Sequence, residues 1–155
     1  MIGNLYELFR WFIFSLVVWF VTAVQADDSR STNHSEKIVL GAGCFWGVEK
    51  AFEKIPGVID VISGYSGGKG VEASYEARTA MANRLNPQNH AEVVEVTVNS
   101  DQVGLERLIQ LFFELHDPTQ LNRQGNDVGT QYRSIIFVRS DDQKKIAQRT
   151  LADYQ

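Results

Sequence analysis

The chain has 155 residues, of which 44% are hydrophobic and 22% are charged, and its formal net charge is −4 at pH 7. This length predicts one domain, and the composition is that of an ordinary folded protein. The modest charge and the absence of basic clusters argue against nucleic-acid binding. The only cysteine, Cys44, excludes an internal disulfide and a cysteine-based zinc cage. The three histidines lack metal-ligand spacing, so we expect no metal site.

An apolar run at residues 11–24 lies near the start of the chain. It is shorter than the roughly 20 residues that span a bilayer, and the small-residue pattern that ends at Ala26 resembles a cleavage site. We therefore expect residues 1–26 to be a signal peptide that directs export to the periplasm or out of the cell. An uncleaved membrane anchor is the alternative. The polar residues 27–36 predict a linker, and residues 37–155 the functional domain.

The residue pattern changes its period at Cys44. Residues 38–40 are β-branched or apolar and lead into a Gly-Ala-Gly turn, and after Cys44 one apolar stripe recurs at intervals of three and four. The stripe consists of Phe45, Val48, Phe52 and Ile55. This pattern predicts a strand, a glycine turn and a helix with Cys44 at its N-terminus.

The position of Cys44 favours reactivity. The free N–H groups and the macrodipole at a helix start favour a thiolate there. Cys44 is therefore a candidate nucleophile, with an inert buried thiol as the alternative. Trp46 falls on the polar side of the predicted helix. It is either a surface residue or one wall of a pocket beside the thiol, and helical phase alone leaves both interpretations open.

The middle of the chain predicts two short elements. Residues 58–62 form a second β-branched run, hence a strand, and residues 64–70 a glycine-rich loop without the spacing of a phosphate-binding loop. Residues 75–85 predict a short helix that ends before Asn86-Pro87.

The alternation over residues 89–99 predicts the clearest strand, with Glu92 on the same face as three valines. A carboxyl on an apolar face has a raised pKa and protonates readily, so Glu92 is a candidate acid. A carboxylate on an edge strand, paired with a lysine or arginine, is the alternative. Glu95 points the other way and is expected to be solvated. His90 is expected to be a structural residue at the strand start.

The C-terminal third predicts a helix over residues 101–115, which His116 ends, where an imidazolium is favoured. Residues 116–130 form a long polar loop of a kind that is usually functional or disordered. Residues 135–138 predict a buried strand, and residues 141–154 a helix capped by Asp141 or Asp142.

The order of the predicted elements indicates the α+β class. We expect a small mixed β-sheet with helices packed on it and the nucleophile at a strand–turn–helix junction. The last predicted helix reaches Gln155 without a stop signal, so we expect that the chain is C-terminally truncated or ends in a shorter form of the domain.

Four stretches resemble the A-type peptide methionine sulfoxide reductases. They are GCFWG at 43–47, GYSGG at 64–68, HAEVVEV at 90–96 and HDPTQLNRQGNDVGTQYRS at 116–134. The resemblance spans roughly residues 37–140. It implies an enzyme that reduces methionine S-sulfoxide, in proteins or free, to methionine, as repair after oxidative damage.

The resemblance also implies roles for individual residues. Cys44 matches the family's nucleophile, and Glu92 matches the acid that protonates the sulfoxide oxygen. The remaining matches bind substrate: Phe45 and Trp46 hold the methyl group, Tyr75 and Tyr132 help to hold the oxygen, and Asp127 lines the pocket. Protonation of the oxygen would allow thiolate attack on sulfur and leave a sulfenic acid on the cysteine.

No bound cofactor is implied, and an external thiol such as thioredoxin would restore the cysteine. The partners implied are oxidised proteins or peptides and a thiol reductant protein, and we expect a monomer. Two departures from the family pattern stand out. The chain lacks further cysteines near its end, and residues 75–90 are longer than usual, with Gln88-Asn89 where Thr-Gly is common. A degenerate domain that binds methionine peptides without chemistry, or a one-cysteine peroxidase, are the alternative functions.

Overall fold

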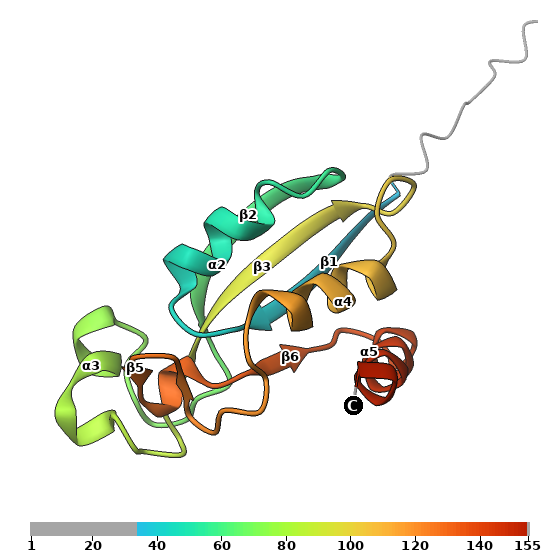
Figure 1. The fold of residues 1–155 in the computed structure, drawn as a ribbon. Helices are drawn as coiled ribbons and strands as arrows, with labels where there is room; N and C mark the ends of the chain where they lie inside the picture. The colour runs from blue at the N-terminus through green and yellow to red at the C-terminus, as the bar shows by residue number, and fades with distance from the viewer. Residues whose placement is uncertain (1–33, 155) are drawn as a thin grey trace, which may run out of the picture. The chain divides into compact units, whose positions relative to one another are not determined.

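The computed structural model describes residues 34–154 (Figure 1). The expected signal peptide lies outside these residues, as does the expected linker up to residue 33. Within the described residues, no helix combines the length and apolar character needed to cross a membrane. In chain order the elements are β1 (Ser35–Gly41), α2 (Phe45–Phe52), β2 (Val58–Ser66), α3 (Tyr75–Thr79), the 3-10 helix η1 (Met81–Asn83), β3 (Ala91–Asn99), α4 (Leu105–Leu115), β4 (Arg123–Gln124), β5 (Asp127–Val128), the 3-10 helix η2 (Thr130–Tyr132), β6 (Ile135–Phe137) and α5 (Asp141–Tyr154).

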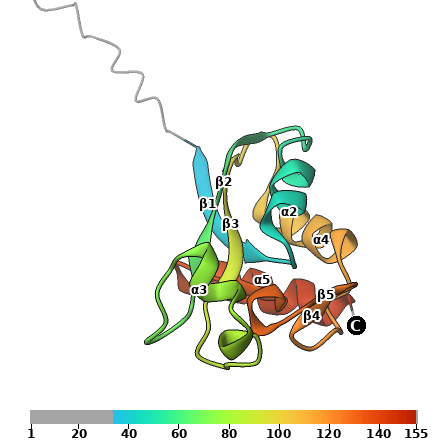
Figure 2. The ribbon, with the colours of Figure 1, turned by 90° about the vertical axis from the view of Figure 1, so that its left-hand side faces the viewer.

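The main sheet has the strand order β2-β3-β1-β6, and its neighbouring strands are antiparallel. Helices α2 and α4 lie on the same face of this sheet in both views (Figures 1 and 2). Helix α5 packs against α4. The arrangement confirms the predicted α+β class, but the expected mixed sheet was wrong, because every strand pairing of this sheet is antiparallel. It also makes β3 an interior strand, so that residues on β3 are flanked by backbone on both sides.

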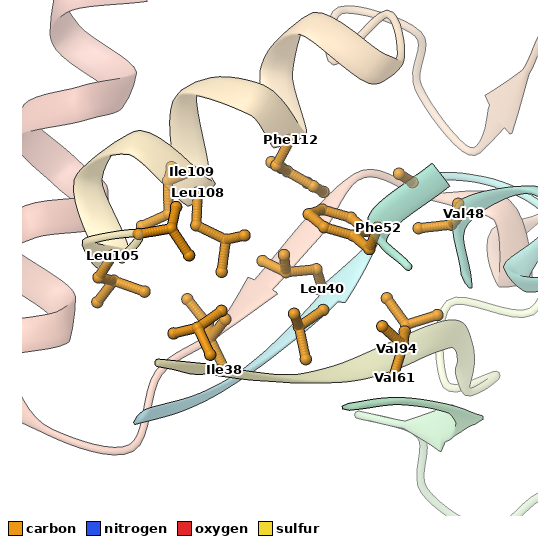
Figure 3. Packing of buried hydrophobic residues seen from close by; sticks show 14 of the residues in the cluster. Ile38, Leu40, Val48, Phe52, Val61, Val94, Leu105, Leu108, Ile109 and Phe112 are labelled. Atoms are coloured by element: carbon orange, nitrogen blue, oxygen red, sulfur yellow. The ribbon is translucent and has the colours of Figure 1, made fainter. Parts of the chain in front are cut away.

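One apolar core joins the covered face of the sheet to α2 and α4. Figure 3 shows side chains from β1, α2 and α4 pointing toward one another, among them Leu40, Phe52 and Phe112, which are fully buried. The valines of β3 that belong to this core are Val94, Val96 and Val98. The helical stripe after Cys44 was therefore predicted correctly as far as Phe52, whereas Ile55 lies beyond the end of α2 and is only partly buried. The inward face of the 89–99 strand was predicted correctly.

Two predicted elements around the glycine-rich stretch were wrong in extent. Strand β2 continues to Ser66 and pairs with β3 up to Ala91, so residues 64–66 belong to the sheet and not to a loop. The expected helix over residues 75–85 separates into α3 and η1, because Ala80 has an extended ψ of 137° that interrupts the helical backbone.

Helix boundaries in the second half also differ from the prediction. Helix α4 begins at Leu105 and not at residue 101, because the Asn99 side chain accepts the N–H of Asp101 in a local turn. Helix α5 has the predicted limits, but the hydroxyl of Ser140, not Asp141 or Asp142, accepts a first-turn N–H group, that of Gln143.

The long polar loop and the last strand were also only partly anticipated. Residues 116–130 contain a two-stranded hairpin of β4 and β5. Strand β6 pairs only with β1 at the sheet edge and is half-buried, whereas a buried strand was expected.

Candidate functional site

Two glycines allow the chain to turn from β1 into α2. A Cβ atom on Gly41 would lie 2.8 Å from Cγ2 of Ile135 and 3.0 Å from the carbonyl oxygen of Glu92. Gly43 has a φ of +98°, which favours glycine, and a Cβ there would lie 2.8 Å from Gln124. The turn ends at Cys44, the half-buried N-cap residue of α2, which confirms the predicted strand–turn–helix junction.

Glu92 lies on the interior strand β3, next to the point where β1 ends. Its side chain is only 1% exposed, and its Oε2 accepts the backbone N–H of Phe45 at 3.1 Å. Burial raises the pKa of Glu92 above its ordinary value. No ion pair to Glu92 occurs within residues 34–154, so the alternative of a paired edge-strand carboxylate is wrong. The buried carboxyl therefore contacts the residue that directly follows the cysteine.

A row of aromatic rings runs alongside this pair. The ring centroids of Tyr65 and Phe45 are 5.4 Å apart, those of Phe45 and Trp46 5.7 Å, and those of Trp46 and Tyr75 6.0 Å. The last pair is stacked, with an interplanar angle of 18°. Trp46 remains 62% exposed, so it covers Tyr75 on one side while keeping surface free for a ligand. This arrangement favours the pocket-wall interpretation of Trp46 over that of an isolated surface residue.

Tyr65 is a residue of this region that the sequence analysis did not select. It lies directly opposite Glu92 in the β2–β3 ladder, and its hydroxyl is buried without a hydrogen-bond partner among the described residues. Burial, together with the charge of Glu92, raises the pKa of Tyr65 to about 12. The alternation of a β-strand could have indicated Tyr65, because residues 61, 63 and 65 share one face if the strand continues through Gly64.

Tyr132 and Asp127 reach the site from the later loop. Burial raises the pKa of Tyr132, and the charge of Glu92 adds to the effect, so this hydroxyl stays protonated at neutral pH. The charge of Asp127 contributes to raising the pKa of Glu92. Both residues line a pocket of about 210 Å³. A larger pocket of about 330 Å³ between α4, β6 and α5 contains none of the candidate site residues.

The histidines and Glu95 have other surroundings. His116 ends α4 as predicted, with its Nδ1–H donating to the carbonyl of Phe112 at 2.7 Å, but burial lowers its pKa, so the expected preference for an imidazolium was wrong. Burial also lowers the pKa of His90. Glu95 is not simply solvated, because it pairs with Lys37 at 2.6 Å and with Arg139. Within residues 34–154, no three His, Cys, Asp or Glu side chains gather as metal ligands.

The comparisons with known proteins agree with this geometry. The family model described as peptide methionine sulfoxide reductase matches residues 36–155. A peptide methionine sulfoxide reductase MsrA of Acidobacterium capsulatum is 51% identical over 113 residues, which make up 72% of this chain and 69% of that protein. The MsrA of Geobacter sulfurreducens is 46% identical over 120 residues, which make up 77% of this chain and 71% of that protein.

Solved structures give the same result. Methionine sulfoxide reductase A of Corynebacterium diphtheriae has a TM-score of 0.69 at 36% identity, over 81% of this chain and 58% of that one. Reduced Mxr1 of Saccharomyces cerevisiae also has a TM-score of 0.69, at 33% identity, over 79% of this chain and 69% of that one. The fold and the site define a reductase domain with a cysteine at a helix start and a buried acid beside it. The chain belongs to the peptide methionine sulfoxide reductase family.

Proposed function

We propose that this chain reduces methionine S-sulfoxide to methionine, in proteins and as the free amino acid, and so repairs oxidative damage. The observation that carries the proposal is the hydrogen bond from the N–H of Phe45 to the carboxyl of Glu92. It places a buried acid with a raised pKa beside the helix start that Cys44 occupies. A sulfoxide is a poor electrophile until its oxygen gains a proton, and this carboxyl can supply one.

In the proposed reaction, Glu92 gives its proton to the sulfoxide oxygen as the sulfur of Cys44 attacks the sulfoxide sulfur. The sulfur–oxygen bond breaks, methionine is released with two more electrons, and the oxygen ends on Cys44 as a sulfenic acid. Two external thiols then reduce the sulfenic acid to the thiol, and they leave as one disulfide together with one water molecule.

The remaining site residues are proposed to bind substrate. Phe45 and the exposed face of Trp46 offer apolar surface for the methyl group on the sulfoxide sulfur. Tyr132 and Tyr75 are proposed to donate hydrogen bonds to the sulfoxide oxygen as negative charge develops on it. Asp127 lines the pocket next to Tyr132 and is proposed to contact the substrate beyond the sulfoxide group.

The proposed reductant is a thioredoxin-type protein. One structural relative, Mxr1 of Saccharomyces cerevisiae, was solved in complex with Trx2, with a TM-score of 0.55 at 26% identity over 79% of this chain and 67% of that one. Cys44 is half-buried, and we propose that an external thiol reduces its sulfenic acid directly.

Export of the protein is a separate proposal. We propose that residues 1–26, which lie outside the described residues, are a signal peptide, that residues 27–36 form a linker, and that the reductase acts outside the cytoplasm. N-terminal sequencing of protein recovered from cells tests this. A mature start at Asp27 supports export with cleavage, whereas an intact Met1 contradicts it.

A single-turnover experiment tests the proposed reaction. Without reductant, each chain should form about one equivalent of methionine from methionine S-sulfoxide, and thioredoxin or dithiothreitol should restore turnover. A Cys44→Ser variant should form none, and retained activity would overturn the assignment. Equal peptide binding by both proteins without any product would indicate a non-catalytic binding domain. Faster consumption of hydrogen peroxide than of sulfoxide would indicate a peroxidase.

A further inference from the structure

Proton transfer from Glu92 leaves a negative charge that the bond from Phe45 holds on one side only. The carboxylate forms on a side chain that is only 1% exposed. An ionised carboxyl in such surroundings is unstable unless hydrogen bonds compensate for the lost water. Oε2 of Glu92 accepts the N–H of Phe45 at 3.1 Å, whereas Oε1 has no donor within residues 34–154. A second donor close to this carboxyl would therefore favour the reaction.

Tyr65 places a phenol beside this carboxyl from the neighbouring strand. It lies directly opposite Glu92 in the β2–β3 ladder, so both side chains point to the same face of the sheet, and the Cβ atoms of such pairs are about 4.5–5.5 Å apart. The ring packs against Phe45, with 5.4 Å between the ring centroids. On the same face, the hydroxyl of Ser63 donates to the carboxylate of Glu49 on α2 at 2.8 Å. The sheet and α2 therefore fix the position of the Tyr65 side chain.

The hydroxyl of Tyr65 is buried and has no hydrogen-bond partner among the described residues. A buried hydroxyl without a partner costs free energy, which points to a partner that forms during the reaction. The substrate does not fit this role, because the hydroxyl has almost no accessible surface for a ligand to contact. Glu92 is buried as well, and it becomes a strong acceptor when it loses its proton.

The charges near Tyr65 favour its role as a donor. Burial, with the charge of Glu92 as the second cause, raises the pKa of Tyr65 to about 12, so the hydroxyl keeps its proton at neutral pH. Among the described residues, Glu92 is the only carboxyl whose charge acts on Tyr65. Arg78, which is fully buried, acts on Tyr65 with a positive charge, and its side chain offers donors only. These surroundings therefore offer the hydroxyl one carboxyl acceptor, which is Glu92.

Other titratable groups surround the pair of Glu92 and Tyr65. They are Cys44 at the start of α2, Tyr75 on α3, Asp127 on β5 and Tyr132 on η2. Burial is the main cause that raises the pKa of Glu92, the bond from Phe45 lowers it, and the negative charge of the exposed Asp127 raises it further. A hydrogen bond from Tyr65 to the carboxylate would act like the bond from Phe45. Its removal would therefore raise the pKa of Glu92.

We propose that Tyr65 is a positioning residue that acts through Glu92, because its hydroxyl donates a hydrogen bond to the carboxylate that forms when Glu92 protonates the sulfoxide oxygen. This role rests on the proposed reductase function. The N–H of Phe45 holds one carboxyl oxygen, and the hydroxyl of Tyr65 holds the other. Hydrogen bonds of this kind are often long in a free enzyme and tighten as the reaction proceeds.

Titration of the Glu92 carboxyl in the free protein tests the bond without any reaction. NMR of protein with isotope-labelled glutamate follows the titration, and Glu92→Gln identifies the signal. Tyr65→Phe keeps the ring and removes only the hydroxyl, so the pKa of Glu92 should rise by about one unit. The matched control is Tyr154→Phe on α5, which removes a hydroxyl that donates to the carbonyl of Phe113 at 3.1 Å. This control should leave the pKa of Glu92 unchanged.

Single-turnover kinetics tests whether the bond serves the reaction. Below the pKa of Glu92, the rate for Tyr65→Phe should fall about tenfold, because the carboxylate that forms has lost a donor. The decline of the rate at high pH, which marks the loss of the proton from Glu92, should begin about one pH unit higher. The KM for methionine sulfoxide should stay within about twofold, since the hydroxyl does not touch the substrate. Tyr154→Phe should equal the wild type in all three measurements.

Two results would overturn the role of Tyr65. One is a pKa of Glu92 that is unchanged or lower in Tyr65→Phe, which would mean that the residue only packs against Phe45 or donates to the substrate itself. The other is a raised pKa with an unchanged rate, which would mean that the bond forms without serving the reaction. The titration requires no turnover, so its failure is distinguishable from failure of the reductase function, which would appear as a wild type that forms no methionine. Thermal unfolding of each variant confirms that it is folded.

Discussion

The β1–α2 junction and the segment of residues 75–89 both line the candidate site, but they are held in opposite ways. Helix α2 is anchored by Phe45, Val48 and Phe52, which are buried in the apolar core. The segment 75–89 contributes no residue to that core. It is held instead by hydrogen bonds, such as the one from Arg78 to Asn89 at 3.2 Å.

The difference assigns different roles to the two regions. Apolar packing of the nucleophile's helix fixes Cys44 and Glu92 relative to each other, as the chemical step requires. A polar, core-free segment can change in length without opening a cavity, so it can change what the site binds. We therefore expect substitutions at the junction to affect the rate of the chemical step or global stability, and substitutions in the segment to affect substrate preference.

The largest expected effect follows from Glu92→Gln. Glutamine keeps an oxygen that can accept the N–H of Phe45, but it has no proton to transfer. General acid catalysis typically contributes about 10²–10⁴-fold, so kcat should fall by that factor while KM changes little. Steady-state kinetics with saturating dithiothreitol measures both. A kcat within a few-fold of the wild-type value would remove Glu92 as the acid.

A large loss of stability is expected for Phe52→Ala. Phe52 is fully buried between the sheet and α4, and truncation of such a phenylalanine costs about 3–5 kcal/mol of unfolding free energy. Urea unfolding of both proteins measures the difference. A loss below about 1 kcal/mol would mean that α2 is not anchored by the core, and the contrast between the two regions would fail.

A smaller loss of unfolding free energy is expected for Asn89→Ala, a substitution within the polar segment of residues 75–89. The Asn89 amide donates to the carbonyls of Arg78 and Asn83 at 3.1 Å each and accepts from the Arg78 guanidinium. Removing these bonds leaves buried groups unpaired, so unfolding free energy should fall by about 1–3 kcal/mol. Unfolding in urea measures this. KM for a peptide should rise more than kcat falls, and the opposite pattern would contradict the assigned roles.

The β1–α2 junction could be predicted from the sequence because the residues that pack into the core recur at regular intervals along each element. The helical stripe after Cys44 and the alternation around Glu92 both record which side of each element meets the core. No such period exists in residues 75–89. Arg78 and Asn89 are fully buried and bond to each other across irregular backbone, which has no fixed period, so nothing in their spacing predicted their burial. Tyr65 was missed because glycines on either side suggested a loop where the strand continues.

The pH dependence of the rate tests the role of Glu92 in the chemical step, independently of residues 75–89. Burial raises the pKa of Glu92, so the carboxyl keeps its proton at a higher pH than an exposed glutamate does. Above that pKa the acid is lost, and kcat should fall by about tenfold per pH unit at most. A thiol nucleophile becomes more reactive as the pH rises, so the nucleophile cannot produce this decline. The pH profile of single-turnover rates checks it, and the decline should be absent in Glu92→Gln.

The smallest effect on stability and kinetics is expected for Ser140→Ala. Ser140 lies in neither region, so this variant is a control for a loss of stability away from the site. The Ser140 hydroxyl accepts the N–H of Gln143 at 3.2 Å at the start of α5. Loss of such a cap costs about 1 kcal/mol of unfolding free energy, which urea unfolding resolves. Helix α5 contributes no candidate site residue, so kcat and KM should equal the wild-type values for short and peptide substrates alike. A changed kcat would mean that the loss of stability at α5 alters catalysis at Cys44. The assignment of separate roles to the β1–α2 junction and to residues 75–89 would then be wrong.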